Sequence, residues 1–224
     1  MPNRQVIETT LGKLFEAERT VRKLHDELAM LPPDQTLEVL LNAVQTANAE
    51  QDEDEAVLRL VRLSSLLGEH EGPRAVDALV DVLASEHPEA RRAAGEELEG
   101  LAYDRFKEVA QGVERALARL PAGSPALYEL PYLIAEVPEP GVTKLLAMFL
   151  KHSDADAVSA AIEALVEIGD PGSAALLRPL VGDKRTVEME DDSSDATSDV
   201  TLGELAEEAL GMLSPYEDEE EERS

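Results

Sequence analysis

The stretch HSDADAVSAAIEALVEIGDPGSAALLRPLVGD, residues 152–183, decides the fold of this chain. Its first half places apolar side chains three or four residues apart, which is the spacing of one helix face: Val158, Ala161, Ile162, Leu165 and Ile168. A break at residues 169–172 follows, and after it comes a second apolar stripe: Leu176, Leu177, Leu180 and Val181. Two helices this short bury too little surface alone, so we expect them to form one unit of a stack.

Three similar helix pairs precede this unit. Amphipathic helices are predicted in pairs, at 55–70 with 72–86, 87–102 with 104–120, and 124–137 with 139–152. The second helices of the four pairs are expected to begin near residues 73, 105, 140 and 171, about 31 to 35 residues apart. The sequence therefore predicts an all-α solenoid of stacked helix pairs over residues 51–213, because each pair needs its neighbour to cover its apolar face.

Two of the pairs carry a family pattern. The motif A-V-x-x-A-x-x-A-L-x-x-I-G-D-P, at residues 157–171, resembles HEAT repeats, in particular the short bacterial type named after the phycobilin lyases. PEARRAA at residues 88–94 matches the same pattern, and the first pair matches it more faintly. The third pair departs from it, with Pro131 inside a helix and Val137-Pro138 where Ile-Gly is expected. The resemblance covers roughly residues 53–213 and implies a fold rather than one function, because such repeats serve many roles.

The N-terminal region, residues 1–50, is predicted to be a helical cap. Residues 4–31 read as one long helix that ends before Pro32-Pro33, with an apolar stripe at Ile7, Leu11, Leu14, Ala17, Val21, Leu24, Leu28 and Leu31. A solenoid needs a cap over its exposed end, and we favour this function for the helix. The stripe also fits a short coiled-coil seam, and a homodimer through this helix is the alternative.

The repeat is interrupted after Asp183. Residues 184–201 are predicted to insert a β-hairpin, because Thr186–Glu190 alternate in polarity and Asp199-Val200-Thr201 can pair with them. A disordered loop is the alternative for this acidic stretch. A last helix is expected at Leu202–Leu213, followed by a disordered acidic tail at 214–224.

The net charge of −28 limits the classes of partner. Such a charge repels nucleic acid and anionic membranes, and it attracts basic proteins. The chain contains no cysteine, its first twenty residues lack the apolar core of a secretory signal, and no apolar run is long enough to span a membrane. We therefore expect a cytoplasmic protein with a protein partner, no nucleic acid and no membrane.

No motif for catalysis, a cofactor or a metal is found. Asp191, Ser193 and Asp195 have the spacing of a calcium loop, but Ala196 replaces the required glycine and Leu202 the required glutamate. The four histidines show no metal-ligand spacing. We predict that the chain is not an enzyme.

The candidate partner-binding residues come from the helix faces opposite the predicted core. Four cations, Arg115, Lys144, Lys151 and Arg178, are expected to form a basic strip on the second helices, which we expect to line the concave side. Such a strip suits an acidic segment, either of a partner or of the tail of this chain; scattered solubilising charge is the alternative. Tyr128 and Tyr132 share one helix face and serve either as a contact for the partner or as core residues.

These observations favour a scaffold or interaction module that binds a protein through its repeat surface. One alternative is an acidic inhibitor or immunity-type protein that masks a basic toxin or nuclease. The other is an accessory protein of the chromophore-lyase type, which only the resemblance suggests.

Overall fold

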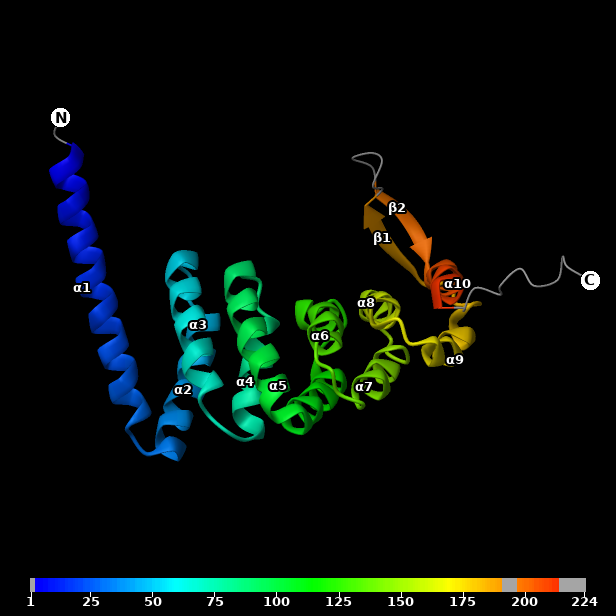
Figure 1. Cartoon of the computed structure of the whole chain (residues 1–224), viewed down its shortest axis with the longest axis horizontal. Coiled ribbons are helices and arrows are strands. Elements are labelled where there is room, and N and C mark those ends of the chain that lie inside the picture. Colours follow the sequence, from blue (N-terminus) through cyan, green and yellow to red (C-terminus); the bar gives the residue numbers. More distant parts are fainter. Residues whose placement is uncertain (1–2, 191–196, 214–224) are drawn as a thin grey trace, which may run out of the picture.

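The computed structural model describes residues 3–190 and 197–213, and over these ranges the chain is an all-α solenoid with one β-hairpin. Helices make up almost all of it, and the hairpin lies just before the last helix (Figure 1). The elements in chain order are α1 (Asn3–Ala29), α2 (Pro33–Asn48), α3 (Glu53–Gly68), α4 (Pro73–Leu83), α5 (Pro88–Arg119), α6 (Pro125–Ala135), α7 (Val142–Phe149), α8 (Ala155–Ile168), η1 (Pro171–Ser173), α9 (Ala174–Leu177), η2 (Arg178–Leu180), β1 (Thr186–Glu190), β2 (Thr197–Thr201) and α10 (Leu202–Leu213).

The helix pairs stack in two rows. The first-helix row contains α3, the N-terminal half of α5, α6 and α8, and the second-helix row contains α4, the C-terminal half of α5, α7 and α9 (Figure 1). α1 and the hairpin rise at the two ends on the side of the first-helix row, so this row is the floor of a wide U (Figure 1). We expected the second helices to line the concave side, and this expectation is wrong because they form the outer row.

Two predicted boundaries change for local reasons. The helices expected at 87–102 and 104–120 are one long element, α5, with a kink at Arg105, where φ is −140° and ψ is 49°. The second helix of the fourth pair is much shorter than expected, because only four residues of α9 are α-helical between two 3₁₀ turns. Pro179 lies in the second turn and has no N–H to donate, so the α-helical ladder cannot continue through it.

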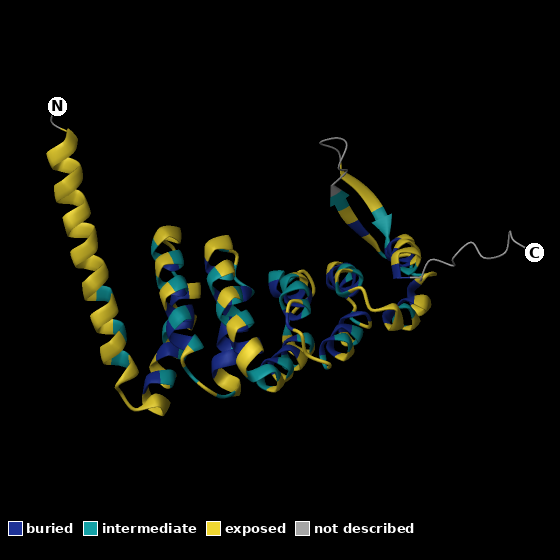
Figure 2. Ribbon diagram, viewed as in Figure 1, coloured by how far each residue is buried: buried dark blue, intermediate teal, exposed yellow. Residues whose placement is uncertain are grey.

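An aliphatic core fills the space between the rows. Phe149 is the largest fully buried side chain, and the next largest are all leucine or isoleucine. Figure 2 shows the buried residues concentrated where the two rows face each other. In the fourth pair the predicted stripe of α8 is buried up to Leu165, whereas Val181 in the second stripe is 39% exposed. The core therefore follows the predicted helix periodicity until η2 replaces the regular helix.

Polar contacts between neighbouring units repeat with the period of the stack. The Arg91 guanidinium donates to Glu129 with an Nε–Oε1 distance of 2.6 Å, and the backbone N–H of Gly123 donates to Asp154 Oδ2 at 2.6 Å. Arg74 likewise pairs with Glu38. The two residues of each pair are 38, 31 and 36 positions apart in the sequence, which is about one repeat. Each unit is thus joined to the next by packing and by hydrogen bonds.

Asp154 also begins the fourth pair. Its side chain accepts hydrogen bonds from the backbone N–H groups of Asp156 and Ala157, so it is the N-cap of α8. Asp170 caps η1 in the same way. Ser124 occupies the N-cap position of α6, but its side chain makes no capping hydrogen bond.

α1 stands at the N-terminal end of the stack, as expected for a capping helix, but it buries none of its residues. Only Val21, His25 and Leu28 are partly buried, and the rest of the helix is exposed (Figure 2). The His25 Nε2 atom lies 2.7 Å from Glu69 Oε1 and joins α1 to the residue that follows α3. α1 therefore meets the stack only along its C-terminal part.

The hairpin and α10 close the other end. β1 and β2 pair antiparallel, with Val187 opposite Val200. The backbone N–H of Thr201 donates to Glu204 Oε2 and the N–H of Glu204 donates to Thr201 Oγ1, which is a capping box at the start of α10. The hairpin insertion and the last helix were both predicted. The tip of the hairpin, with the calcium-like spacing at 191–195, and the tail at 214–224 lie outside the described residues.

Candidate partner-binding surfaces

The predicted basic strip lies on the outer, second-helix row. Lys144 is exposed on α7, Lys151 follows that helix, and Arg178 is exposed in η2. None of these three cations forms an ion pair with a carboxylate of the described residues.

Arg115, the fourth member of the strip, is engaged within the chain. Its guanidinium lies 2.9 Å from the Asp77 carboxylate and also donates to the backbone carbonyl of Pro73. One turn further along α5, Arg119 pairs with Asp81 at 2.5 Å. These contacts join α4 to the C-terminal half of α5, so Arg115 connects two helices of the stack. The predicted basic strip is therefore reduced to three cations.

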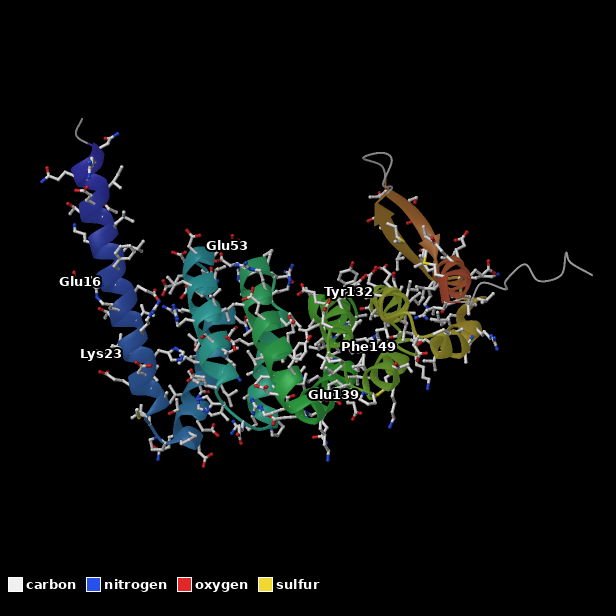
Figure 3. The ribbon with its side chains drawn as sticks, viewed as in Figure 1. Glu16, Lys23, Glu53, Tyr132, Glu139 and Phe149 are labelled. Carbon is white, nitrogen blue, oxygen red and sulfur yellow. The ribbon has the colours of Figure 1, made fainter. Side chains whose placement is uncertain are left out.

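The two predicted tyrosines lie on the first-helix row, away from the strip. Tyr128 and Tyr132 are both on α6, with their ring centroids 5.3 Å apart and the ring planes at 66°. Figure 3 shows Tyr132 on the side of the stack toward which α1 and the hairpin rise, whereas Glu139 lies at the opposite edge. The structure therefore separates the six predicted residues into two surfaces.

Tyr132 holds a carboxylate of the next unit in place. Its hydroxyl donates to Glu163 Oε2 at 2.6 Å, and the Ser159 hydroxyl donates to the other oxygen of Glu163 at 3.3 Å. Burial, and then the hydrogen bond to Glu163, raise the pKa of Tyr132 far above its ordinary value. The hydroxyl therefore stays protonated as a donor, and Glu163 has a fixed orientation at the edge of α8.

Glu163 lies on the rim of a groove of about 310 Å³ between α8, the hairpin and α10, which we call the C-terminal groove. Its rim carries three carboxylates, Glu163 and Glu167 from α8 and Glu208 from α10. The floor and walls are apolar and are formed by Ile162, Val166, Met189, Leu205, Ala209 and Met212. An anionic rim above an apolar floor can hold a side chain or a segment that is apolar along its length and basic at its end.

The base of the hairpin fixes one wall of this groove. Arg185 donates to the backbone carbonyls of His152 and Ser153, at 2.8 and 3.2 Å, and pairs with Asp183 at 2.6 Å. The hydrogen bond from Arg185 holds the pKa of Asp183 below its ordinary value, so this pair is ionised at neutral pH. These contacts join the start of β1 to the turn before α8, and Met189 of β1 lines the groove together with Val166 of α8.

Sequence reasoning missed this groove because its parts lie far apart in the chain. The only signal was the alternation in β1, which directs Val187 and Met189 to the same face, and Val187 is buried. Nothing in the sequence indicated that this face would meet α8.

Metal binding and membrane spanning were also tested on the structure. Within residues 3–190 and 197–213, no group of three or more histidine or acidic side chains is arranged to hold a metal ion. Over the same residues, no helix is both long and apolar enough to cross a membrane.

Comparisons with known proteins add little. No family model and no curated protein matches the chain. Among solved structures it is similar to two engineered proteins, at 19% and 17% identity, covering 87% and 88% of this chain and 89% and 91% of theirs, with TM-scores of 0.32 and 0.31. It is also similar to computationally designed armadillo repeat proteins for modular peptide recognition, at 13% identity over 94% of each chain, with a TM-score of 0.33. At these identities and TM-scores the similarity does not define a family for this chain, and the solenoid is established by the helix pairs described above.

Proposed function

We propose that this chain is a non-catalytic helical-repeat scaffold, with repeats of the HEAT type, which binds a basic amphipathic segment of a protein partner in the C-terminal groove. The observation that carries the proposal is the groove itself, which combines an apolar floor with three carboxylates on its rim. Such a pairing matches a segment with apolar residues on one face and lysine or arginine beside them.

The composition of the groove supports protein binding. Met189 and Met212 contribute flexible thioether side chains that can adapt to different apolar partners, and Met212 is 61% exposed. The Tyr128 and Tyr132 pair lies next to Glu163 and provides aromatic surface of the kind enriched in protein interfaces.

The charge of the whole chain supports a basic partner. At a net charge of −28 the chain attracts cations over distances beyond direct contact, which raises the rate of encounter with a basic protein. This proposal includes the acidic inhibitor as one form of the same function, because a masked toxin or nuclease surface would also be basic. A cytoplasmic location, expected from the sequence, stays a prediction.

The second-helix row offers a second candidate site, which would bind an acidic partner. Lys144, Lys151 and Arg178 are exposed and have no carboxylate partner among the described residues, although acidic residues greatly outnumber basic ones in the chain. An acidic segment would dock there. No contact favours a function in chromophore attachment, and we do not propose it.

The test uses methionine methyl groups as reporters. The probe is a helical peptide of lysine and leucine, about four turns long, added to the full chain labelled with ¹³C at its methionine methyls. We expect the signals of Met189 and Met212 to shift, while those of Met30 and Met148, which lie outside the groove, keep their positions. Shifts at Met148 alone, or at no methionine, would contradict docking in the groove.

Matched variants separate the site from the net charge. Replacing Glu163, Glu167 and Glu208 with glutamine should weaken peptide binding about tenfold, or about 1.4 kcal/mol, because the rim loses its charges. The control replaces three exposed carboxylates elsewhere, Glu86, Glu114 and Glu139, with glutamine and changes the net charge equally. Equal weakening by both variants would mean that the peptide senses only the overall charge.

A further inference from the structure

The N-terminal end of the stack has an apolar surface that the described part of the chain does not cover. Five large apolar side chains of α1 are between 43% and 59% exposed: Ile7, Leu11, Leu14, Phe15 and Leu24. Ile7, Leu11 and Leu14 lie on one face of the helix, and Figure 3 shows Glu16 and Lys23 on its other side, facing away from the stack. An apolar stripe of this length is normally covered by another protein surface.

The C-terminal part of α1 forms one wall of a groove. This α1–α3 groove has a volume of about 660 Å³. Its apolar lining comes from Val21, Leu24 and Leu28 of α1 and Val57, Leu58, Val61 and Leu66 of α3, and its polar lining comes from His25, Asp54, Arg62 and Glu89. Leu58 is 64% exposed, so the outer face of α3 lacks the cover that a neighbouring helix gives inside the stack. The N-terminal part of α1 extends beyond α3 and has no neighbour among residues 30–190 and 197–213 (Figure 1).

One molecule therefore carries both halves of an interface, an apolar ridge on the first half of α1 and an apolar groove beside its second half. Two copies related by a two-fold axis place each ridge in the groove of the other copy. We propose that the chain forms a homodimer in which the α1 helices of two copies pair antiparallel, each filling the α1–α3 groove of its partner.

The sequence of α1 fits this antiparallel register. With the axis between Ala17 and Glu18, the apolar positions face one another in three layers: Ile7 with Leu28, Leu11 with Leu24, and Leu14 with Val21. Every member of these layers belongs to the stripe that is exposed on α1 or lines the groove. Between Leu14 and Val21 the charged residues are Glu16, Glu18 and Arg19. Glu16 lies on the side away from the stack (Figure 3), and Glu18 forms an ion pair with Arg22 of its own helix at 3.1 Å.

The charge of α1, compared with that of the whole chain, favours a second copy as the occupant of the groove and favours the antiparallel arrangement. α1 contains five basic and five acidic residues, so it is neutral in a chain whose net charge is −28. It is thus a surface on which two copies meet without strong repulsion. α1 is about 40 Å long, so an antiparallel pair holds the two acidic stacks at opposite ends, well beyond the screening length of about 10 Å, whereas a parallel pair places them side by side.

The first test is the mass of the full chain in solution, measured by sedimentation and light scattering. We expect a species of twice 24.3 kDa for the natural chain and a 24.3 kDa monomer for the double variant Leu11→Asp with Leu14→Asp. The control, Gln5→Asp with Thr9→Asp, adds the same charge on the polar side of α1 and should stay dimeric. A natural chain that is monomeric up to about 100 μM overturns the proposal.

The second test measures the arrangement of the helices and does not depend on how the aspartate variants fold. Because the chain has no cysteine, a single introduced cysteine reports one position. Ala17→Cys, next to the axis, should cross-link to itself under mild oxidation, whereas Ile7→Cys should not, because the two copies of this position lie about 30 Å apart. A mixture of Ile7→Cys and Leu28→Cys chains should give the mixed pair. Efficient self-cross-linking of Ile7→Cys means a parallel pair and overturns the proposal.

Discussion

The two ends of this solenoid are closed to different degrees. At the C-terminal end, α10 has 12 residues and buries Leu202, Leu205, Ala206 and Ala209 among others against the last helix pair. At the N-terminal end, α1 has 27 residues and buries none of them. Length therefore does not decide whether a terminal helix covers its stack. The C-terminal end is completed within the chain, and we infer that the N-terminal end is completed by a second copy.

The ends also differ in how the terminal helix is fixed to the stack. The backbone N–H groups of Leu202 and Gly203 donate to the carbonyls of Arg185 and Asp183, so backbone bonds hold the start of α10. Among the described residues, α1 is held to the stack by a side-chain hydrogen bond between His25 and Glu69 and by the packing of Leu28 against the core. A substitution at the C-terminal end should therefore cost more stability than a comparable change at the N-terminal end.

The largest effect is expected from Gly203→Ala. A Cβ atom at this position would lie 2.6 Å from the carbonyl oxygen of Val181, so the backbone must move to admit it. We expect a loss of about 2 to 3 kcal/mol in the free energy of unfolding, measured by urea denaturation, with faster hydrogen exchange along α10.

Gly211→Ala in the same helix is the matched control. It is exposed and would place its Cβ atom in open space, so we expect a gain of about 0.5 to 1 kcal/mol from higher helix propensity. If both alanine variants change the free energy of unfolding by the same amount, the stability of α10 does not depend on the close contact at Gly203.

A smaller effect is expected at Glu97, near the N-terminal end. Burial, and then the charges of Glu69 and Glu96, raise the pKa of Glu97 above its ordinary value. A carboxyl group with a raised pKa favours the folded state at low pH, and this contribution is lost as the pH rises through its folded pKa. Glu97→Gln should therefore increase stability at neutral pH by a few tenths of a kcal/mol, since solvent screens much of the effect.

The pH dependence of unfolding provides the check on Glu97. The gain from Glu97→Gln should disappear when thermal unfolding is measured below about pH 4, where the natural side chain is also neutral in the unfolded chain. Replacing Glu99, which lies on the same helix, with glutamine is the comparison. A gain that persists at low pH would have a cause other than charge.

The smallest effect on the stack is expected from removing α1. A chain that begins at Pro33 should have the same free energy of unfolding as the monomeric Leu11→Asp, Leu14→Asp variant, within about 0.5 kcal/mol. The reason is that no residue of α1 is itself buried. Urea denaturation of both chains at one concentration makes the comparison. Aggregation of the shortened chain, or a large loss of stability, would show that α1 protects the end of the stack.

The fold was predictable from sequence wherever the helix periodicity was regular. The stripe of α8 is buried where it was predicted up to Leu165, and α10 has the predicted bounds. The prediction was wrong at α9, because one proline inside a short helix ends the α-helical hydrogen bonding, and periodicity alone does not show this. The curvature of the stack was also misjudged, because it depends on small rotations between units that no local pattern encodes.

The candidate sites were less predictable for a different reason. Phasing of the helices correctly directed Lys144 away from the core, but it did not reveal that Arg115 pairs with Asp77 from the preceding unit. The C-terminal groove depends on where β1 lies against α8, which is a contact between elements rather than a property of either. Helix faces can be predicted one at a time, whereas pairing and grooves require the neighbouring unit.

The spacing of the inter-unit hydrogen bonds has a consequence for how the chain reaches its native state. Partners such as Arg91 and Glu129 are about one repeat apart, so the contacts that join the units close only short loops of chain. Folding of this kind has low contact order, can start in any unit and spreads to adjacent ones. The stack should therefore assemble quickly and fray from its weaker end, so that a ribosome-bound chain acquires structure unit by unit as it emerges.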